Sequence, residues 1–595
     1  MTLTSMRLSY LQLTCRFASI VLLLSAPAVS QASNENPQQR LRSADAAFHA
    51  GYAAEKKGDL ATARRQFEQV IRLAPNIAEG HSALGSVLVQ LGDFQKAIGE
   101  LLRALALEPD DRISQTNLAI AYEQSGEHEK SLASFRALEA HAEGALPASA
   151  VIFYIRALAA TEQTDVAIAK TQRALLATPE DPVLHDTLGS LDSQRQDWDE
   201  AVIQFNDAVR LSPNFAEAHL HLGLALMMQE RLSEATEELK TAAALSPQSA
   251  VIQIDLAKAL IAGNENANAV TVLQRAILLD PSSFEAKYQL GLALQNSGEE
   301  LKAIPFFQEV VAAEPENAQA LANLGLALVQ TGRAKDAIPL YRKALAKNGG
   351  DPLLHQNLGV AYLQQSDLDD AVAEFRAGLK LSSDAYELHY DLGLALKLRD
   401  EITAAASELE LAARLNPNSP DPPYTLGILE MQRGNFEAAA GELRSALRLR
   451  PANGDGWATL GSVYKQQNKL LEASEALKKA IELMPDQPGP HITLAGILAQ
   501  QGLSPDAASE RKLASELTRQ ATNRQRATFA ANAGSNLLLK GQITDAIDRY
   551  EEAVASDPTS AEAHRGLATA LERAGRSAEA EAEKKKAAQL GQAAP

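Results

Sequence analysis

A 34-residue period constrains the fold of this 595-residue chain more than any other feature. Proline recurs at that step at 75 and 109, from 179 to 315, and from 417 to 485. Ten residues after each such position stands Gly or Ala, and twelve residues further stands a second small residue, as in Gly325 and Ala337. A large apolar residue such as Tyr341 usually follows four positions later. Self-similarity at such a period is typical of stacked repeats.

The spacing within each period predicts two amphipathic helices of about 13 residues. Gly325 leaves no side chain where the second helix crosses, and Ala337 lets the two backbones approach. Gly332 ends the first helix, and the recurrent proline ends the second, since it disfavours helix at the residue before it. The high Ala and Leu content also favours helix, because these residues cost little there.

The repeat resembles that of the tetratricopeptide repeat (TPR) family. This resemblance implies an all-α fold, an α-solenoid in which antiparallel helix pairs form a right-handed TPR superhelix with the first helices on its concave face. It also implies a non-enzymatic protein that binds other proteins or peptide segments. Sixteen units fill the chain and leave no separate catalytic domain: units 1–3 in 44–145, units 4–14 in 146–521, and units 15–16 with a C-terminal capping helix in 522–595.

Two units depart from the pattern. The fourth has Ile155 in place of the small residue, and the fourteenth has Arg511 where an aromatic or leucine usually stands. Extra residues lie beside both, at 146–147 and 522–526. Because repeat arrays couple mainly to nearest neighbours, we expect bends or looser stacking near 140–156 and 511–527.

The first residues have the pattern of a secretory signal. Arg7 and Arg16 precede an apolar run at 17–24, and small residues follow to Ala32. The run is shorter than the about 20 residues that span a bilayer. We expect a signal peptide over 1–32, a disordered linker over 33–43, and an exported protein, periplasmic or secreted, with no membrane span after signal removal. An uncleaved anchor is the alternative.

Composition argues against several classes of function. A formal net charge of −19 disfavours binding to nucleic acid. The single cysteine excludes an intrachain disulfide framework and a Cys-cluster metal site. No nucleophile triad, phosphate-binding loop or zinc spacing appears, so we expect no catalytic residue, no cofactor and no metal. Seven histidines share one slot, four residues before the small residue, and stacked helices would point them in parallel; packing is therefore favoured over metal binding.

Polar residues two positions before the small residue form a ladder on the expected concave face. Amides and hydroxyls at regular steps could bond the backbone of an extended peptide. The pattern is similar to the amide ladder of O-GlcNAc transferases, although few members here are Asn. Alternatively, these groups bond neighbouring turns. The predicted peptide-binding residues are Asn117, Asp255, Gln289, Asn323, Asn357, Asp391 and Asn532.

An apolar stripe accompanies the ladder, where the residue after the small residue is repeatedly apolar instead of polar. With neighbours at i+3 and i+4 it predicts a partly exposed apolar groove in units six to twelve. The alternative is packing against the adjacent first helix. The predicted groove residues are Leu224, Met227, Tyr288, Leu292, Leu326, Val360, Tyr390, Leu394, Tyr424 and Ile428.

These features predict an interaction scaffold in the cell envelope. Two alternatives remain open: an accessory TPR subunit of an envelope polysaccharide or protein export assembly, and a regulatory partner of a separately encoded enzyme. The sequence sets no oligomeric state.

Overall fold

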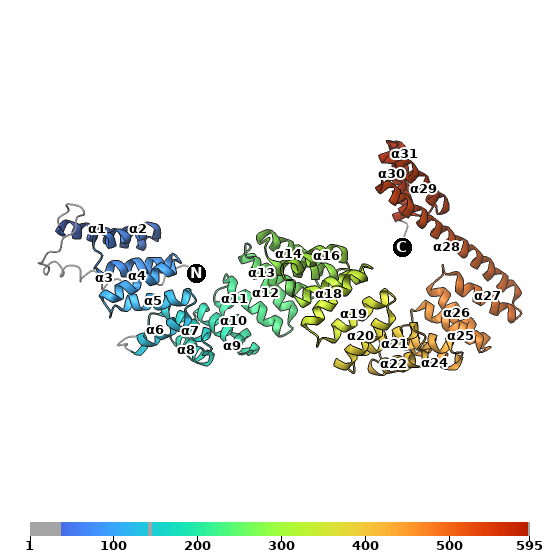
Figure 1. Cartoon of the computed structure of the whole chain (residues 1–595), viewed down its shortest axis with the longest axis horizontal. Helices are drawn as coiled ribbons and strands as arrows, with labels where there is room; N and C mark the ends of the chain where they lie inside the picture. Colours follow the sequence, from blue (N-terminus) through green and yellow to red (C-terminus); the bar gives the residue numbers. More distant parts are fainter. Residues whose placement is uncertain (1–36, 141–145, 593–595) are drawn as a thin grey trace. The chain divides into compact units, whose positions relative to one another are not determined.

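A computed structural model describes residues 37–140 and 146–592, and within these ranges every regular element is an α-helix. The chain groups into two compact units, Met1–Val310 and Val311–Pro595. Consecutive helices are paired as antiparallel hairpins, which can be followed along each unit in Figure 1. The all-α repeat architecture predicted from the period is confirmed.

The helices that begin in the first unit are α1 (Pro37–Lys56), α2 (Leu60–Leu73), α3 (Ala78–Gln90), α4 (Phe94–Leu107), α5 (Arg112–Gln124), α6 (His128–Ala140), α7 (Ala148–Ala160), α8 (Thr164–Ala177), α9 (Pro182–Gln194), α10 (Trp198–Leu211), α11 (Ala216–Met228), α12 (Leu232–Leu245), α13 (Ala250–Ala262), α14 (Asn266–Leu279), α15 (Phe284–Asn296) and α16 (Glu300–Ala313).

The helices of the second unit are α17 (Ala318–Gln330), α18 (Ala334–Lys347), α19 (Pro352–Gln364), α20 (Leu368–Leu381), α21 (Tyr386–Leu398), α22 (Ile402–Leu415), α23 (Asp421–Gln432), α24 (Phe436–Leu449), α25 (Gly454–Gln466), α26 (Leu470–Leu483), α27 (Pro488–Gln500), α28 (Ser504–Leu539), α29 (Ile543–Ser556), α30 (Ala561–Arg573) and α31 (Ser577–Gln592).

The small residue of each first helix is required by close contact within the hairpin. A Cβ atom added to Gly325 would lie 2.7 Å from the ring of Tyr341, and one added to Gly359 would lie 2.5 Å from the ring of Phe375. Both rings are fully buried. The prediction that a missing side chain admits the second helix is therefore confirmed.

The turn between the two helices of a hairpin has a left-handed residue at a fixed position. Gly332 has φ +75° there, as the sequence predicts for the end of a first helix. Several repeats place a non-glycine residue in the same conformation, including Ser366 at φ 62° and Asp400 at φ 64°. The repeat geometry thus imposes this turn even where the residue does not favour it.

Looser stacking was expected near 140–156, and it is found in the described helices there, since α7 packs less closely on α8 than the two helices of either neighbouring hairpin pack on each other. Ile155 is fully buried in one core cluster that extends over α5–α9. The residue opposite it, where other repeats carry a ring or leucine, is the small Thr171, also fully buried. The larger residue stands on the first helix instead of the second, so the core is filled although α7 and α8 make less contact than the neighbouring hairpins do. Residues 141–145 lie outside the described residues.

Helix α28 runs unbroken for 36 residues across the predicted boundary at 521/522. It combines the second helix of the fourteenth repeat with the first helix of the fifteenth. Residues 511–527 contain no Gly or Pro to end a helix, so the five extra residues extend the helix instead of forming a bend. Between Leu517 and Ala527 no residue of α28 is buried.

A disordered linker was predicted over 33–43, but residues 37–43 belong to a helix. Helix α1 begins at Pro37, a favoured first helical residue, and continues into buried Ala44, Ala47 and Phe48. The ring of Phe48 lies 5.6 Å from that of Phe67 on α2, which anchors the helix. The predicted signal peptide lies outside the described residues. Among the described helices, none combines the length and apolar character needed to span a membrane.

Candidate functional site

The shared histidine slot builds a two-contact clamp in five of the seven repeats that carry it, while His355 and His491 make only the contact to Glu. In α21, Nδ1 of His389 lies 2.6 Å from Oε2 of Glu408 on α22, and Nε2 lies 3.1 Å from the carbonyl oxygen of Ser383 in the preceding loop. Each ring nitrogen therefore lies within hydrogen-bond distance of an oxygen atom. The same two contacts recur at His81, His219 and His564, and His185 makes them with Gln204 in place of Glu.

Other residue types in this slot make the loop contact alone. Nε2 of Gln115 donates to the carbonyl oxygen of Pro109 at 2.7 Å, and Nε1 of Trp457 donates to that of Pro451 at 2.8 Å. In these repeats an N–H group in the slot reaches the loop carbonyl six residues back, whereas Leu321 and Pro423 occupy the same slot elsewhere. The expected packing role is right, but the sequence interpretation missed these bonds. The detectable signal was a Glu or Gln 19 residues after each histidine.

The histidines also do not converge on a metal. In His389, for example, both nitrogens face a carboxylate or carbonyl oxygen, whereas Nε2 of His491 has no hydrogen-bond partner among the described residues. Within residues 37–140 and 146–592, no three His, Cys, Asp or Glu side chains lie close enough to hold an ion.

Among the described residues, some members of the polar ladder interact with neighbouring side chains, and others do not. Asp255 accepts from Lys258 at 3.4 Å, Gln289 donates to Glu285 at 3.0 Å, and Asn323 interacts with a neighbouring group. The half-buried amides of Asn117 and Asn357 have no partner among the described residues, and Asn532 is exposed on α28. The use of the ladder by a peptide stays a prediction.

Asp391 is the ladder residue with the most perturbed ionisation. It accepts a hydrogen bond of 2.7 Å from Gln356 on the preceding first helix, α19. Burial raises the pKa of its carboxyl group to about 6, and the charge of Glu387 adds to this, whereas the bond from Gln356 opposes it. An acid with a raised pKa marks a position where a donor or cation from a partner would be favourable.

Asp391→Asn should stabilise the protein at pH 7 by about 1 kcal/mol, because it removes a carboxylate whose charge is unfavourable in the folded state. As pH falls, the Asp391 carboxyl group of the folded wild type takes up its proton near pH 6, whereas in the unfolded chain it does so only near pH 4. Wild-type stability therefore rises as pH falls through this window, and the advantage of the variant disappears below it. Denaturant unfolding at pH 7 and pH 4 measures this difference. Asp370→Asn, at an exposed position of α20, is the control, and an equal effect there would contradict the prediction.

In the first unit, the apolar stripe is half-buried and interrupted. Met227 packs against the cluster around Phe205, and the ring of Tyr288 lies 5.9 Å from that of Phe307. Between the helices that carry them, α13 places Lys258 at the stripe position. Lys258 pairs with Asp255 and, at 3.1 Å, with Glu285 on α15. A charged group therefore separates Leu224 and Met227 from Tyr288 and Leu292.

In the second unit, the stripe has no such interruption. Four consecutive first helices, α17, α19, α21 and α23, place apolar residues at the same position, each half-buried: Leu326, Val360, Leu394 and Ile428. Helix α19 contacts both α17 and α21. Tyr390 and Tyr424 lie one helical turn earlier and are also half-buried. The longest apolar surface of the predicted set therefore belongs to the second unit.

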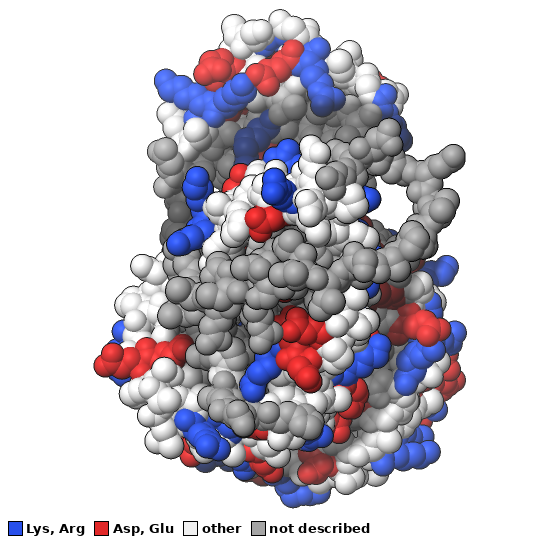
Figure 2. Space-filling view, turned by 90° about the vertical axis from the view of Figure 1, so that its left-hand side faces the viewer, with Lys and Arg blue, Asp and Glu red and all other residues white. Residues whose placement is uncertain are grey.

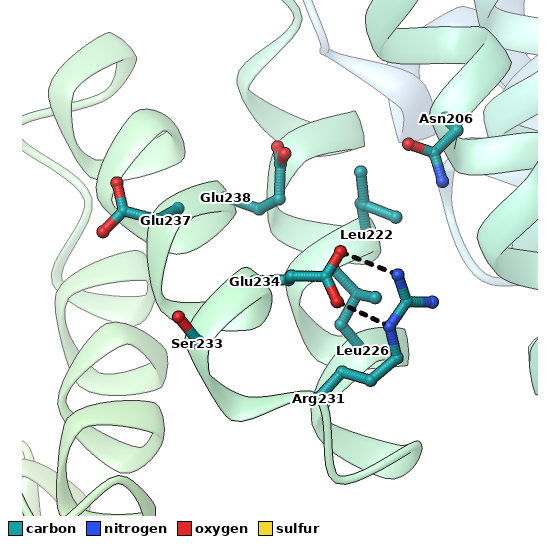
Figure 3. Close-up of a pocket in the computed structure, with 8 residues that line it drawn as sticks. All are labelled: Asn206, Leu222, Leu226, Arg231, Ser233, Glu234, Glu237 and Glu238. Carbon is teal, nitrogen blue, oxygen red and sulfur yellow. Dashed lines mark hydrogen bonds and ion pairs between the residues drawn. The ribbon is translucent and has the colours of Figure 1, made fainter.

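A small cavity of about 210 Å³ lies among α10, α11 and α12. Figure 3 shows Arg231 reaching across it to Glu234, with two hydrogen bonds of 2.8 and 2.7 Å. The other lining carboxylates are also paired, Glu238 with His219 at 2.6 Å and Glu237 with Lys240 at 2.9 Å. The charges of this cavity are thus satisfied within the protein, and it has the character of a packing junction.

A larger cavity of about 650 Å³ opens between α27 and α28, and the sequence interpretation did not locate it. Its lining includes Ile492 and Gly496 of α27 and Arg511, Ser515 and Arg519 of α28. Arg511 is the residue that replaces the usual aromatic or leucine, so the missing ring was the available signal. The side chain of Ile492 is 57% exposed.

Surface charge is mixed. On the face in Figure 2, the visible Lys and Arg side chains alternate with Asp and Glu over the described residues. Along the described helices, many charged side chains are paired at i and i+3, for example Arg333 with Asp336 and Lys479 with Glu482. Such exposed pairs contribute little to stability.

The hairpin stack and its half-buried stripe define the chain as a helical-repeat scaffold. The tetratricopeptide repeat family matches most of it, and the chain belongs to this family. The matched residues are 48–112, 82–148, 187–250, 226–294, 284–317, 301–352, 328–386, 424–488 and 532–595. The fold is typically that of a non-enzymatic protein–protein interaction scaffold.

Solved structures with similar repeats share little sequence with the chain. The APC/C hetero-tetramer Cut9–Hcn1 is 16% identical over 90% of this chain and 98% of that chain, with a TM-score of 0.34. MamA from Desulfovibrio magneticus RS-1 is 21% identical over 28% and 95%, with a TM-score of 0.27. YrrB, a TPR protein with an unusual peptide-binding site, is 22% identical over 31% and 95%, with a TM-score of 0.27. A search of curated proteins gave no match.

Proposed function

We propose that the chain is a non-enzymatic scaffold that binds extended peptide or protein segments on the first helices of its second unit. The observation that supports this most is the uninterrupted stripe of Leu326, Val360, Leu394 and Ile428, each still partly exposed. Contiguous apolar surface that solvent can reach is typical of a protein-binding site.

Polar groups beside the stripe supply the complementary chemistry. On each first helix the ladder residue stands three positions before the stripe residue, as Asn357 does before Val360 and Asp391 before Leu394. These pairs lie on one helical face. The amide of Asn357 can both donate to and accept from a peptide backbone, and Asp391 can accept from a peptide N–H or a basic side chain. Alternate side chains of an extended ligand would then contact the apolar residues.

The test uses the full chain and a displayed library of random peptides. Peptides selected on the wild type should lose at least about tenfold in affinity on Leu326→Glu with Leu394→Glu, because each substitution places a charge in the apolar stripe. The matched control is Leu471→Glu, at a 74% exposed position at the start of α26. Equal binding by wild type and the double variant would refute the groove assignment.

We also propose that the protein is exported to the periplasm or outside the cell, on the pattern of Arg7, Arg16 and the apolar run that follows them. Fractionation of the native cells tests this. An accessory role in an envelope polysaccharide or protein export assembly, or regulation of a separately encoded enzyme, would use the same peptide-binding surface. The identity of captured partners distinguishes these roles.

A further inference from the structure

The long helix α28 leaves one repeat without its usual neighbour. Elsewhere a second helix ends, the chain turns, and the first helix of the next repeat packs back on the hairpin. In the fourteenth repeat the second helix continues in a straight line through Leu517 and Thr522 to Leu539. The cavity between α27 and α28 opens on the side of that hairpin where the next first helix would pack.

Equivalent positions in other repeats show what normally fills this space. Nineteen residues after the small residue, Val70 meets Gly80, and Gly378 meets Leu388, each at the start of the following first helix. Directly after the small residue, Lys258 pairs with Glu285 of the following first helix. In the fourteenth repeat the corresponding residues are Ala514 and Gly496, and both line the cavity. The cavity therefore has the lining of a seat for a helix.

The seat is basic, in contrast to the acidic chain around it. Residues 511–526 contain five Lys or Arg and one acidic residue, whereas the whole chain has a net charge of −19. Arg511 has no partner among the described residues, and Arg519 is paired with Glu516 at 2.7 Å. The ammonium nitrogen of Lys465 lies 3.7 Å from the position of a Cβ on Gly496, so α25 adds a third cation. Of the acidic neighbours, Glu510 is bound to His491 at 2.6 Å.

We infer that this seat, formed by Ile492, Gly496, Arg511, Ser515, Thr518 and Arg519, binds an acidic amphipathic helix of a partner protein in place of the absent first helix. Its apolar face contacts Ile492 and Ala514. Its carboxylates form ion pairs with Arg511, Arg519 and Lys465. The corresponding ion pair in an ordinary repeat is that of Lys258 with Glu285. This surface is separate from the stripe proposed above and does not depend on it.

The test uses the full chain and two fluorescent peptides derived from α15, Phe284–Asn296. This is the helix whose Glu285 pairs with Lys258 of the preceding repeat. The acidic peptide carries Lys287→Glu, and the basic peptide carries Glu285→Lys, so the two differ only in charge sign at these two positions. We expect the acidic peptide to bind at least about tenfold more tightly than the basic one, since two partly buried charges are reversed.

Two variants of the chain locate the binding. Arg511→Glu with Arg519→Glu should weaken the acidic peptide about tenfold. Gly496→Leu should do the same without a charge change, because a Cβ at Gly496 meets only Nζ of Lys465, at 3.7 Å, and a larger side chain fills the cavity. The control, Arg524→Glu with Arg526→Glu, makes the same charge change on the same helix outside the cavity and should leave binding intact. Leu326→Glu with Leu394→Glu should also leave it intact.

Three results would overturn the inference. They are equal binding of the two peptides, unchanged binding by both cavity variants, and equal loss in the Arg524 and Arg526 control. Sedimentation of the chain alone tests a fourth result. If the chain forms a dimer that Arg511→Glu with Arg519→Glu dissociates, the occupant of the seat is a second copy of the chain, and the inference is overturned.

Discussion

Replacing Gly359 by alanine should destabilise the second unit by about 3 kcal/mol, the upper end of the usual cost of overpacking. The added Cβ would lie 2.5–2.8 Å from three atoms of the Phe375 ring, which is fully buried and held between helices. The ring has no room to withdraw, so the helices must separate. Hydrogen exchange of the amides in α19 and α20 should show the loss locally, because repeat arrays do not unfold as one two-state system.

Gly441→Ala is the matched control. Gly441 also lies within a helix, α24, but a Cβ there meets no atom within 4 Å. The same substitution should therefore stabilise by up to about 1 kcal/mol through helix propensity. If both substitutions change exchange protection in the same direction, close hairpin contact is not the reason for the glycine slot.

The second large effect is expected at the histidine clamp. His389→Ala should cost about 2–3 kcal/mol, because it removes a charge-assisted hydrogen bond to Glu408 and a bond to the Ser383 carbonyl. His389 is only 6% exposed, so water replaces these bonds poorly. A double-mutant cycle with Glu408→Ala isolates the side-chain pair from the loop contact.

The His185–Gln204 pair is the natural comparison, since it has the same geometry with a neutral partner, at 2.8 Å. A cycle with His185→Ala and Gln204→Ala should give a smaller coupling energy, as neutral hydrogen bonds are weaker. A coupling near zero for His389 and Glu408 would mean that the slot acts through packing alone.

The sequence predicted the hairpins because their determinants repeat at short range. Gly325 and Tyr341 stand 16 residues apart, and most repeats use that interval to place a small residue against a large one. The fourth repeat broke the pattern at Ile155, and we expected looseness. The helices there do make less contact than in the neighbouring repeats, but the small Thr171 that leaves room for Ile155 could be recognised only by comparing both members of the pair, which determine the packed volume together.

The path of the chain at 522–526 was not predictable from the period. Counting residues shows an insertion, but a turn and a longer helix both accommodate one. Thr522 to Arg526 contain no helix-ending residue, and this local preference decided the outcome. The basic cavity follows from that continuity, so it was equally hidden. In the stripe, the spacing placed Leu326 and Leu394 on one face, while the interruption at Lys258 required knowledge of its partners.

The uninterrupted helix α28 changes how stability passes along the second unit. Most repeats are coupled to their neighbours by buried side chains, and the final hairpins have their own core, which includes Leu538, Ile547 and Leu567. Across the exposed stretch between Leu517 and Ala527, the linkage is backbone hydrogen bonding along a single helix. The free energy of packing between repeats is replaced here by the free energy of extending one helix through these residues, which helix–coil theory describes by a propagation constant. At this one junction, therefore, cooperativity depends on the helical preference of a few solvated residues.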